Sequence, residues 1–146
     1  MSTGLLFAAL SGALVSSLVP VVNAELLLIG LSLAAAPASA PLLVVAFAVG
    51  QMIGKSTLFL TGGRLTRTPV GQRLTRWGLD GRTKRAGIPL IALSASVGMP
   101  PFYLVSVAAP SLGVRFRTFV MVGLAGRIVR FAAVVAVPAV VSAFTQ

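Results

Sequence analysis

Four charged side chains lie inside the apolar stretches of this 146-residue sequence: Glu25, Lys55, Arg127 and Arg130. A charge at the centre of a bilayer costs roughly 2.5–3.5 kcal/mol on insertion scales, so such residues usually face a partner or a polar cavity. Arg127 and Arg130 are spaced i, i+3, which places them on one face of a helix. We therefore predict a polar cavity in which Glu25 faces these cations.

The predicted cavity carries a surplus of positive charge, because one carboxylate cannot neutralise three cations. Helix N-termini at breaks inside the membrane would add positive dipole ends. Such a cavity suits an anionic ligand, for example a lipid phosphate. A structural ion pair is the alternative, with Lys55 or Arg130 extending its charged end to the membrane interface.

Most catalytic chemistry is excluded by the residues that the sequence lacks. It contains no cysteine and no histidine, which removes disulfides, thiol nucleophiles, zinc sites and Ser-His dyads. Its two carboxylates, Glu25 and Asp80, lie in an apolar and a basic context respectively. We predict that the chain is not an enzyme and has no metal or cofactor.

The composition indicates an integral membrane protein. Hydrophobic residues make up 57% of the chain and charged residues 10%, whereas a soluble domain has about 25% charged residues. Twelve basic and two acidic residues give a net charge of +10, a balance that can indicate nucleic-acid binding. Seven of the basic residues, however, form one block: Arg64, Arg67, Arg73, Arg76, Arg82, Lys84 and Arg85. We interpret this block as a cytoplasmic loop bound to anionic lipid headgroups, not to nucleic acid.

Two apolar stretches have the length of membrane-spanning helices. The first covers residues 42–61 and is expected to end at Gly62 and Gly63, since glycine favours a helix C-terminus. The second covers residues 116–137.

Two further apolar stretches are interrupted, and we predict that each forms a re-entrant hairpin. Residues 5–36 are broken at Pro20, and residues 88–109 at Gly98, Pro100 and Pro101. The two arms of 88–109 are about 10–12 residues each, too short to span a bilayer. A hairpin there also returns the arginines that follow it to the cytoplasmic side, as the positive-inside rule requires.

The predicted fold is therefore an all-α integral membrane protein with two re-entrant helical hairpins, each followed by a transmembrane helix. Residues 1–63 form the first hairpin and spanning helix, 64–87 the basic cytoplasmic loop, and 88–146 the second hairpin and spanning helix. Two such units entering from opposite faces resemble the inverted repeats of secondary transporters. The two units share a short sequence similarity, Gly54-Lys55 in the first and Gly126-Arg127 in the second.

A Gly-x-x-x-Gly motif at Gly50 and Gly54 lets another helix approach closely in lipid. We expect this contact inside the chain, and a face for a homo-oligomer is the alternative.

Four motifs, in order and spacing, resemble one known family. They are Pro20-x-x-x-x-Glu25, Gly50-x-x-x-Gly54-Lys55-x-x-x-Phe59, Val97-Gly98-Met99-Pro100-Pro101 and Gly126-Arg127-x-x-Arg130-Phe131. Together they are similar to segments of the DedA (VTT, SNARE-associated) membrane family. Lys55 stands where that family often has Asp, and Phe59 where it has Tyr.

The resemblance implies a multi-pass protein of the bacterial cytoplasmic membrane whose hairpins meet near the midplane. It also implies a flippase or scramblase for an anionic lipid, such as a polyprenyl phosphate or a phospholipid. A membrane scaffold or accessory subunit with purely structural hairpins is the alternative function. Membrane lipids and their anionic headgroups are the expected partners.

Overall fold

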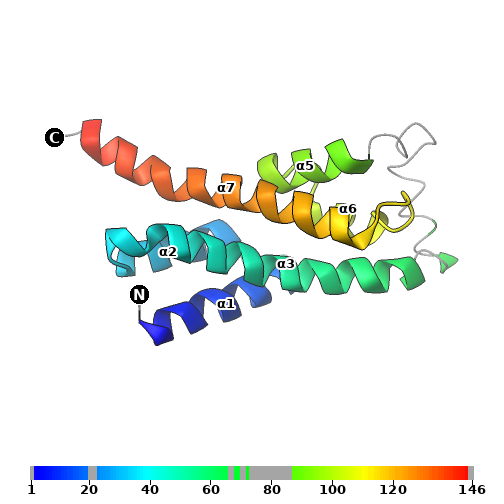
Figure 1. The fold of residues 1–146 in the computed structure, drawn as a ribbon, viewed down its shortest axis with the longest axis horizontal. Coiled ribbons are helices and arrows are strands. Elements are labelled where there is room, and N and C mark those ends of the chain that lie inside the picture. Colours follow the sequence, from blue (N-terminus) through cyan, green and yellow to red (C-terminus); the bar gives the residue numbers. More distant parts are fainter. Residues whose placement is uncertain (1, 20–22, 66–67, 70–71, 73–86, 145–146) are drawn as a thin grey trace. The chain divides into compact units, whose positions relative to one another are not determined.

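The computed structural model describes residues 2–19, 23–65, 68–69, 72 and 87–144. These residues form α-helices and one 3-10 turn, with no strand among them, which confirms the predicted all-α class. The elements are α1 (Thr3–Leu18), α2 (Ala24–Ala34), the 3-10 turn Pro37–Ser39, α3 (Ala40–Leu65), α5 (Gly87–Val97), α6 (Phe102–Ala108) and α7 (Phe116–Phe144) (Figure 1).

Two of the described helices are long and apolar enough to cross a membrane. They cover 25 residues of α3, Ala40–Arg64, and 22 residues of α7, Phe116–Val137. By contrast, α1 has 16 residues, and α2 and α5 have 11 each. These lengths are below the roughly 20 residues that a spanning helix needs. The predicted division into two long and two interrupted apolar stretches is therefore found in the helix lengths.

The helix breaks fall where glycine and proline predict them. The first helix ends at Leu18, and Pro20 itself lies outside the described residues. Helix α5 ends at Val97, and Gly98 then adopts a positive φ of 88° that favours glycine. Pro100 and Pro101 follow immediately, before α6 begins. Both prolines lack the amide hydrogen that would continue the helix.

The predicted end of the third helix at Gly62 and Gly63 is wrong, because α3 continues to Leu65. A Cβ atom added at Gly62 would lie 2.9 Å from the Cα of Val107 and closer still to its carbonyl oxygen. Gly62 therefore lies inside α3 and lets the backbone of Val107 approach this helix closely. It does not end the helix.

The chain divides into two compact units. Unit 1 comprises Met1–Gly54 and Arg127–Gln146, and unit 2 comprises Lys55–Gly126. Each unit contains one pair of short helices and the first part of the long helix that follows the pair. Each also contains the last part of the other long helix.

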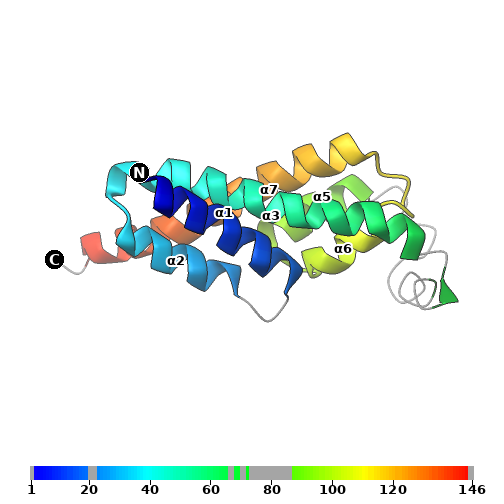
Figure 2. The same ribbon diagram turned by 90° about the horizontal axis from the view of Figure 1, so that it is seen from below.

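In unit 1, glycines bring α3 close to the first short helix. Helices α1 and α2 pack side by side (Figure 2). A Cβ atom at Gly50 would lie 2.8 Å from the carbonyl oxygen of Leu10, and one at Gly54 would collide with Ser17 of the same helix. The Gly-x-x-x-Gly motif thus makes a contact inside the chain, as expected.

We expect Gly50→Ala to destabilise the protein by about 1–3 kcal/mol, because the added methyl group would meet backbone atoms that cannot move aside. Gly30→Ala is the matched control, since nothing lies within 4 Å of a Cβ atom at that helical position. The control should be neutral or stabilising by up to about 1 kcal/mol, the difference in helix propensity. Thermal unfolding in detergent measures both, and equal stability of the two variants would contradict the packing described.

In unit 2, the second pair of short helices forms a hairpin. Helices α5 and α6 pack against each other. A Cβ atom at Gly87, the first residue of α5, would lie 2.9 Å from the side chain of Val114, which follows α6. The hairpin therefore begins and ends at the same end of the unit. Gly126 lets α7 pack closely on α5, because a Cβ atom at this glycine would lie 2.7 Å from the Cβ of Ala95.

The two long helices share a sequence pattern that is longer than the pair Gly54-Lys55 and Gly126-Arg127. The pattern Phe-x-x-x-x-x-x-Gly-(Lys or Arg)-x-x-x-Phe occurs at residues 47–59 of α3 and again at residues 119–131 of α7. In unit 1, Phe47 packs edge-on against Phe131 with ring centroids 5.3 Å apart. In unit 2, Phe59 packs against Phe119 at 4.8 Å. The first phenylalanine of each pattern thus contacts the last phenylalanine of the other.

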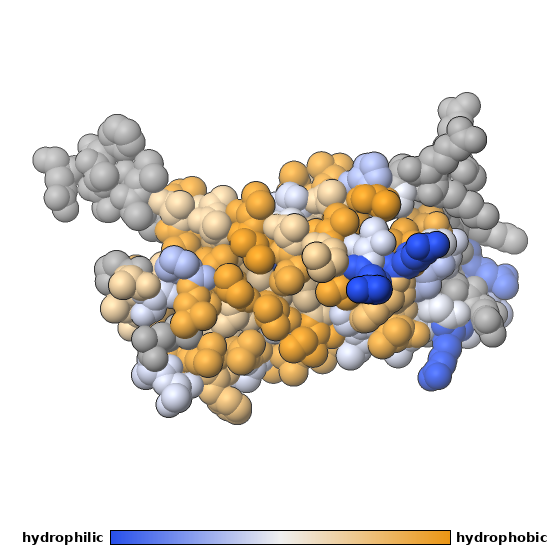
Figure 3. Space-filling model, in the orientation of Figure 1, coloured by the Kyte–Doolittle hydropathy of each residue, from blue (hydrophilic) through white to orange (hydrophobic). Residues whose placement is uncertain are grey.

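Apolar side chains are exposed in both units. Examples are Leu26 and Leu33 in unit 1, and Leu60 and Met121 in unit 2, each more than half exposed. Apolar residues cover most of the face shown in Figure 3. A surface of this kind is unfavourable in water and suits a hydrocarbon solvent.

Candidate functional site

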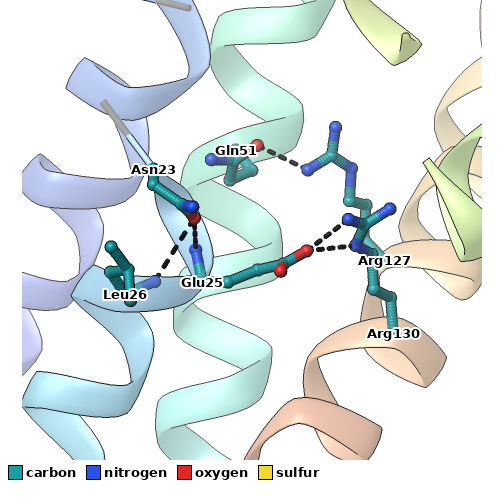
Figure 4. Close-up of polar contacts among 6 residues, drawn as sticks. All are labelled: Asn23, Glu25, Leu26, Gln51, Arg127 and Arg130. Carbon is teal, nitrogen blue, oxygen red and sulfur yellow. Dashed lines mark hydrogen bonds and ion pairs between the residues drawn. The ribbon is translucent and has the colours of Figure 1, made fainter. Parts of the chain in front are cut away.

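The candidate site lies in unit 1 and begins at the start of α2. Asn23 caps this helix, with its side-chain oxygen accepting hydrogen bonds from the backbone N–H groups of Glu25 at 2.9 Å and Leu26 at 3.4 Å (Figure 4). The cap holds Glu25 in the first helical turn, where the helix dipole favours a negative charge.

The Glu25 carboxylate forms an ion pair with Arg130 of α7. The Nε atom of Arg130 donates to Oε1 of Glu25 at 2.7 Å, and a terminal guanidinium nitrogen donates to the same oxygen (Figure 4). The Glu25 side chain is 34% exposed and the Arg130 side chain 27%. A charge-assisted pair of this kind joins the start of α2 to the middle of α7.

Arg127 begins a chain of hydrogen bonds that crosses the interior of unit 1. Its guanidinium donates to the side-chain oxygen of Gln51 at 2.7 Å (Figure 4). The Gln51 amide nitrogen donates to the hydroxyl of Ser16 at 2.7 Å, and that hydroxyl donates to the carbonyl of Ala13 at 3.0 Å. Gln51 is 2% exposed and Arg127 9%. All three bonds run in the same donor direction, an arrangement in which each bond polarises the next.

The Arg127 guanidinium also lies over an aromatic ring. Its central carbon is 5.7 Å from the centroid of Phe131, the ring that packs on Phe47. Cation–π attraction is strongest where water is excluded. The ring therefore favours a charged arginine at this buried position.

The structure groups three of the four predicted cavity residues. Glu25, Arg127 and Arg130 belong to unit 1, whereas Lys55 belongs to unit 2. There Lys55 is 6% exposed, and its ammonium nitrogen lies 5.3 Å from the ring centroid of Tyr103.

Sequence reasoning missed Gln51 and Ser16. A glutamine between two packing glycines of an apolar helix was a usable signal, because an amide in that setting needs a hydrogen-bond partner. Ser16 gave no such signal, since a helical serine can satisfy itself on its own backbone.

The predicted hairpin turn at Gly98, Pro100 and Pro101 connects α5 to α6. The hydroxyl of Ser94 donates to the carbonyl of Pro100, which ties the end of α5 to the turn. Because Ser94 is almost fully buried, this bond also satisfies a polar group that water does not reach.

Little of the predicted headgroup-binding loop can be placed. Arg64 is exposed at the end of α3, and Arg115 and Arg117 are exposed around the start of α7. The other basic residues of the loop lie outside the described residues: Arg67, Arg73, Arg76, Arg82, Lys84 and Arg85.

No family profile, curated protein sequence or solved structure matches this chain. The geometry of the chain itself is therefore the basis for assigning a function. In the described residues it offers two arginines, a carboxylate and a neutral amide in an apolar unit, which is a set suited to holding an anion.

Proposed function

We propose that the chain is an integral membrane protein of the DedA-like type in the bacterial cytoplasmic membrane. Helices α3 and α7 would span the bilayer, and the α1–α2 and α5–α6 pairs would re-enter from opposite faces. The lengths of the helices and the exposed apolar side chains of both units support this arrangement. In the α5–α6 turn, Met99, Pro100 and Pro101 are exposed, so in a membrane interior this non-helical backbone would have to line a water-filled cavity or be covered by protein.

The reciprocal phenylalanine contacts support an inverted repeat. If α3 and α7 are equivalent, the contact between Phe47 and Phe131 has the contact between Phe119 and Phe59 as its counterpart. The same equivalence relates Gly54, which faces α1, to Gly126, which faces α5. Two pairs of matched contacts at equivalent positions are what duplication of one hairpin-and-helix unit would leave.

The topology is testable because the chain has no cysteine of its own. We expect Arg64→Cys and Arg115→Cys to be labelled by an impermeant maleimide only from the cytoplasmic side. The contact of Gly63 with Pro110, 3.7 Å from a Cβ atom added at the glycine, supports a shared end for the two positions. Labelling from opposite sides would mean that the segment between them contains a full span, and the re-entrant hairpin would be wrong.

We further propose that the protein moves an anionic lipid, a polyprenyl phosphate or a phospholipid, across the bilayer. The observation that carries this proposal is the buried chain of Arg127, Gln51 and Ser16 beside the Glu25–Arg130 pair. Ionisable groups at membrane depth are expensive, and they commonly mark the path of an ion or a substrate. An arginine next to a neutral amide can exchange its hydrogen bonds for those of a phosphate oxygen.

Reconstitution into liposomes tests the transport proposal. Fluorescent phosphatidylglycerol in the inner leaflet should become accessible to a membrane-impermeant quencher faster in proteoliposomes than in protein-free liposomes. Folded, inserted protein that leaves the rate at the protein-free level would contradict transport and favour the scaffold function. Thermal unfolding of the same preparation establishes that the protein is folded.

A further inference from the structure

The side-chain charges of unit 1 are unequal. Residues 1–54 contain one charged residue, Glu25, and residues 127–146 contain two, Arg127 and Arg130. One carboxylate is thus shared by two guanidinium groups, and the side-chain charges of the unit sum to +1. Glu25 accepts two hydrogen bonds from Arg130, whereas the Arg127 guanidinium donates to the neutral Gln51.

The net side-chain charge of unit 1 stays positive because Gln51 is neutral. It lies where a carboxylate would be nearly isosteric and would form an ion pair with Arg127, because its side-chain oxygen already accepts from that guanidinium at 2.7 Å. The chain instead has a neutral amide at this position, which is 2% exposed.

The surroundings of Gln51 could accommodate a carboxylate. The amide nitrogen of Gln51 donates to the Ser16 hydroxyl, which in turn donates to the Ala13 carbonyl. A hydroxyl group can rotate and donate to a carboxylate oxygen instead. The neutral residue is therefore not required by the hydrogen-bonding partners around it.

We infer that Gln51 is a specificity-determining residue, which keeps unit 1 at a net charge of +1 and so selects a substrate with a singly charged phosphodiester headgroup. A zwitterionic headgroup adds no net charge and leaves the surplus in place, whereas a headgroup of charge −1 neutralises it. This inference rests on the proposed transport function and names the class of lipid that the same site takes. Gln51 acts on selectivity through the negative charge that it does not carry beside Arg127, and not through the geometry of its amide.

The test compares the translocation of fluorescent phosphatidylglycerol and fluorescent phosphatidylcholine in proteoliposomes. The parent protein should prefer phosphatidylglycerol. Gln51→Glu should lower the ratio of the two rates by about tenfold, the effect of losing one charge-assisted interaction with the headgroup. Gln51→Met, which has a similar volume but no charge, should keep the ratio whatever its absolute rates.

Two results would overturn the inference. One is a Gln51→Glu protein that keeps the parental ratio, and the other is an equal loss of the ratio in the Glu and Met variants, which would assign the effect to amide geometry. If Gln51→Glu does not fold, Arg127→Gln lowers the charge sum by the same amount. It must then lower the ratio in the same way, and an unchanged ratio overturns the inference.

A binding measurement separates this inference from the transport proposal. Dihexanoyl phosphatidylglycerol should raise the thermal stability of the detergent-solubilised parent more than dihexanoyl phosphatidylcholine does, and Gln51→Glu should remove the difference. If the parent moves no lipid but shows this pattern, transport fails and the charge-selection inference stands. If the parent moves lipid while its stability and rates do not distinguish the two headgroups, transport stands and the inference fails. A parent that neither moves nor distinguishes the lipids overturns both.

Discussion

Arg127→Met is expected to reduce the translocation of an anionic lipid by about tenfold or more, because a charge-assisted hydrogen bond to the phosphate is lost in a water-poor site. The protein should stay folded. Methionine fills much of the space of the arginine stem above Phe131, and the main loss is that the Gln51 oxygen no longer accepts from Arg127. An unsatisfied neutral group of this kind costs about 1–3 kcal/mol. Liposome assays and thermal unfolding on one preparation measure both effects.

Arg117→Met is the matched control for this experiment. It is the same substitution on the same helix, but Arg117 is exposed near the start of α7 and belongs to unit 2. Its translocation rate should remain near that of the parent. If Arg127→Met moves lipid as fast as Arg117→Met, Arg127 is not part of a lipid path.

The all-α class and the positions of the helix breaks were predictable because the signals that define them are local. Proline cannot continue a helix, so the interruptions at Pro20 and at Pro100-Pro101 predicted the ends of α1 and α5. The end of α3 was not predictable in the same way. Gly62 is compatible with both a helix stop and a close helix contact, and only the position of Val107, distant in sequence, decides between them.

The candidate site was predictable in its residue types and only partly in its connections. Charge in an apolar stretch singled out Glu25, Arg127 and Arg130, which the structure places in one unit. The bond from Arg127 to Gln51 joins positions on two different helices, and its formation depends on how those helices rotate toward each other. A single sequence contains no direct record of that rotation.

The repeat in the long helices was visible in the sequence but could not be weighed without contacts. Phenylalanine and glycine are common in apolar helices, so a pattern shared by residues 47–59 and 119–131 is weak evidence by itself. It gains meaning because Phe47 contacts Phe131 while Phe59 contacts Phe119. Reciprocal contacts constrain an arrangement in a way that matching letters do not.

Glu25 and Arg130 are expected to show strong coupling in a double-mutant cycle of stability. Glu25→Gln leaves Arg130 without its carboxylate, and Arg130→Met leaves Glu25 without its cation. Breaking one partner of a buried ion pair typically costs about 3–5 kcal/mol, whereas replacing both is often close to neutral. Since the two side chains are 27% and 34% exposed, we expect each single variant to lose about 1–3 kcal/mol, between the values for exposed and for buried pairs. The double variant should lose less than either single variant.

The cycle also separates the role of this pair from that of Arg127. If Glu25 and Arg130 fix the middle of α7 on the start of α2, the double variant should regain stability and still favour the anionic lipid. Its remaining unit 1 charge, that of Arg127, is again +1, because the substitutions remove one charge of each sign. Additive losses of stability would mean that the two side chains do not interact in the folded protein. A stable double variant that no longer favours the anionic lipid would place the pair itself in contact with the substrate, and Arg127 would then share its role with a second arginine.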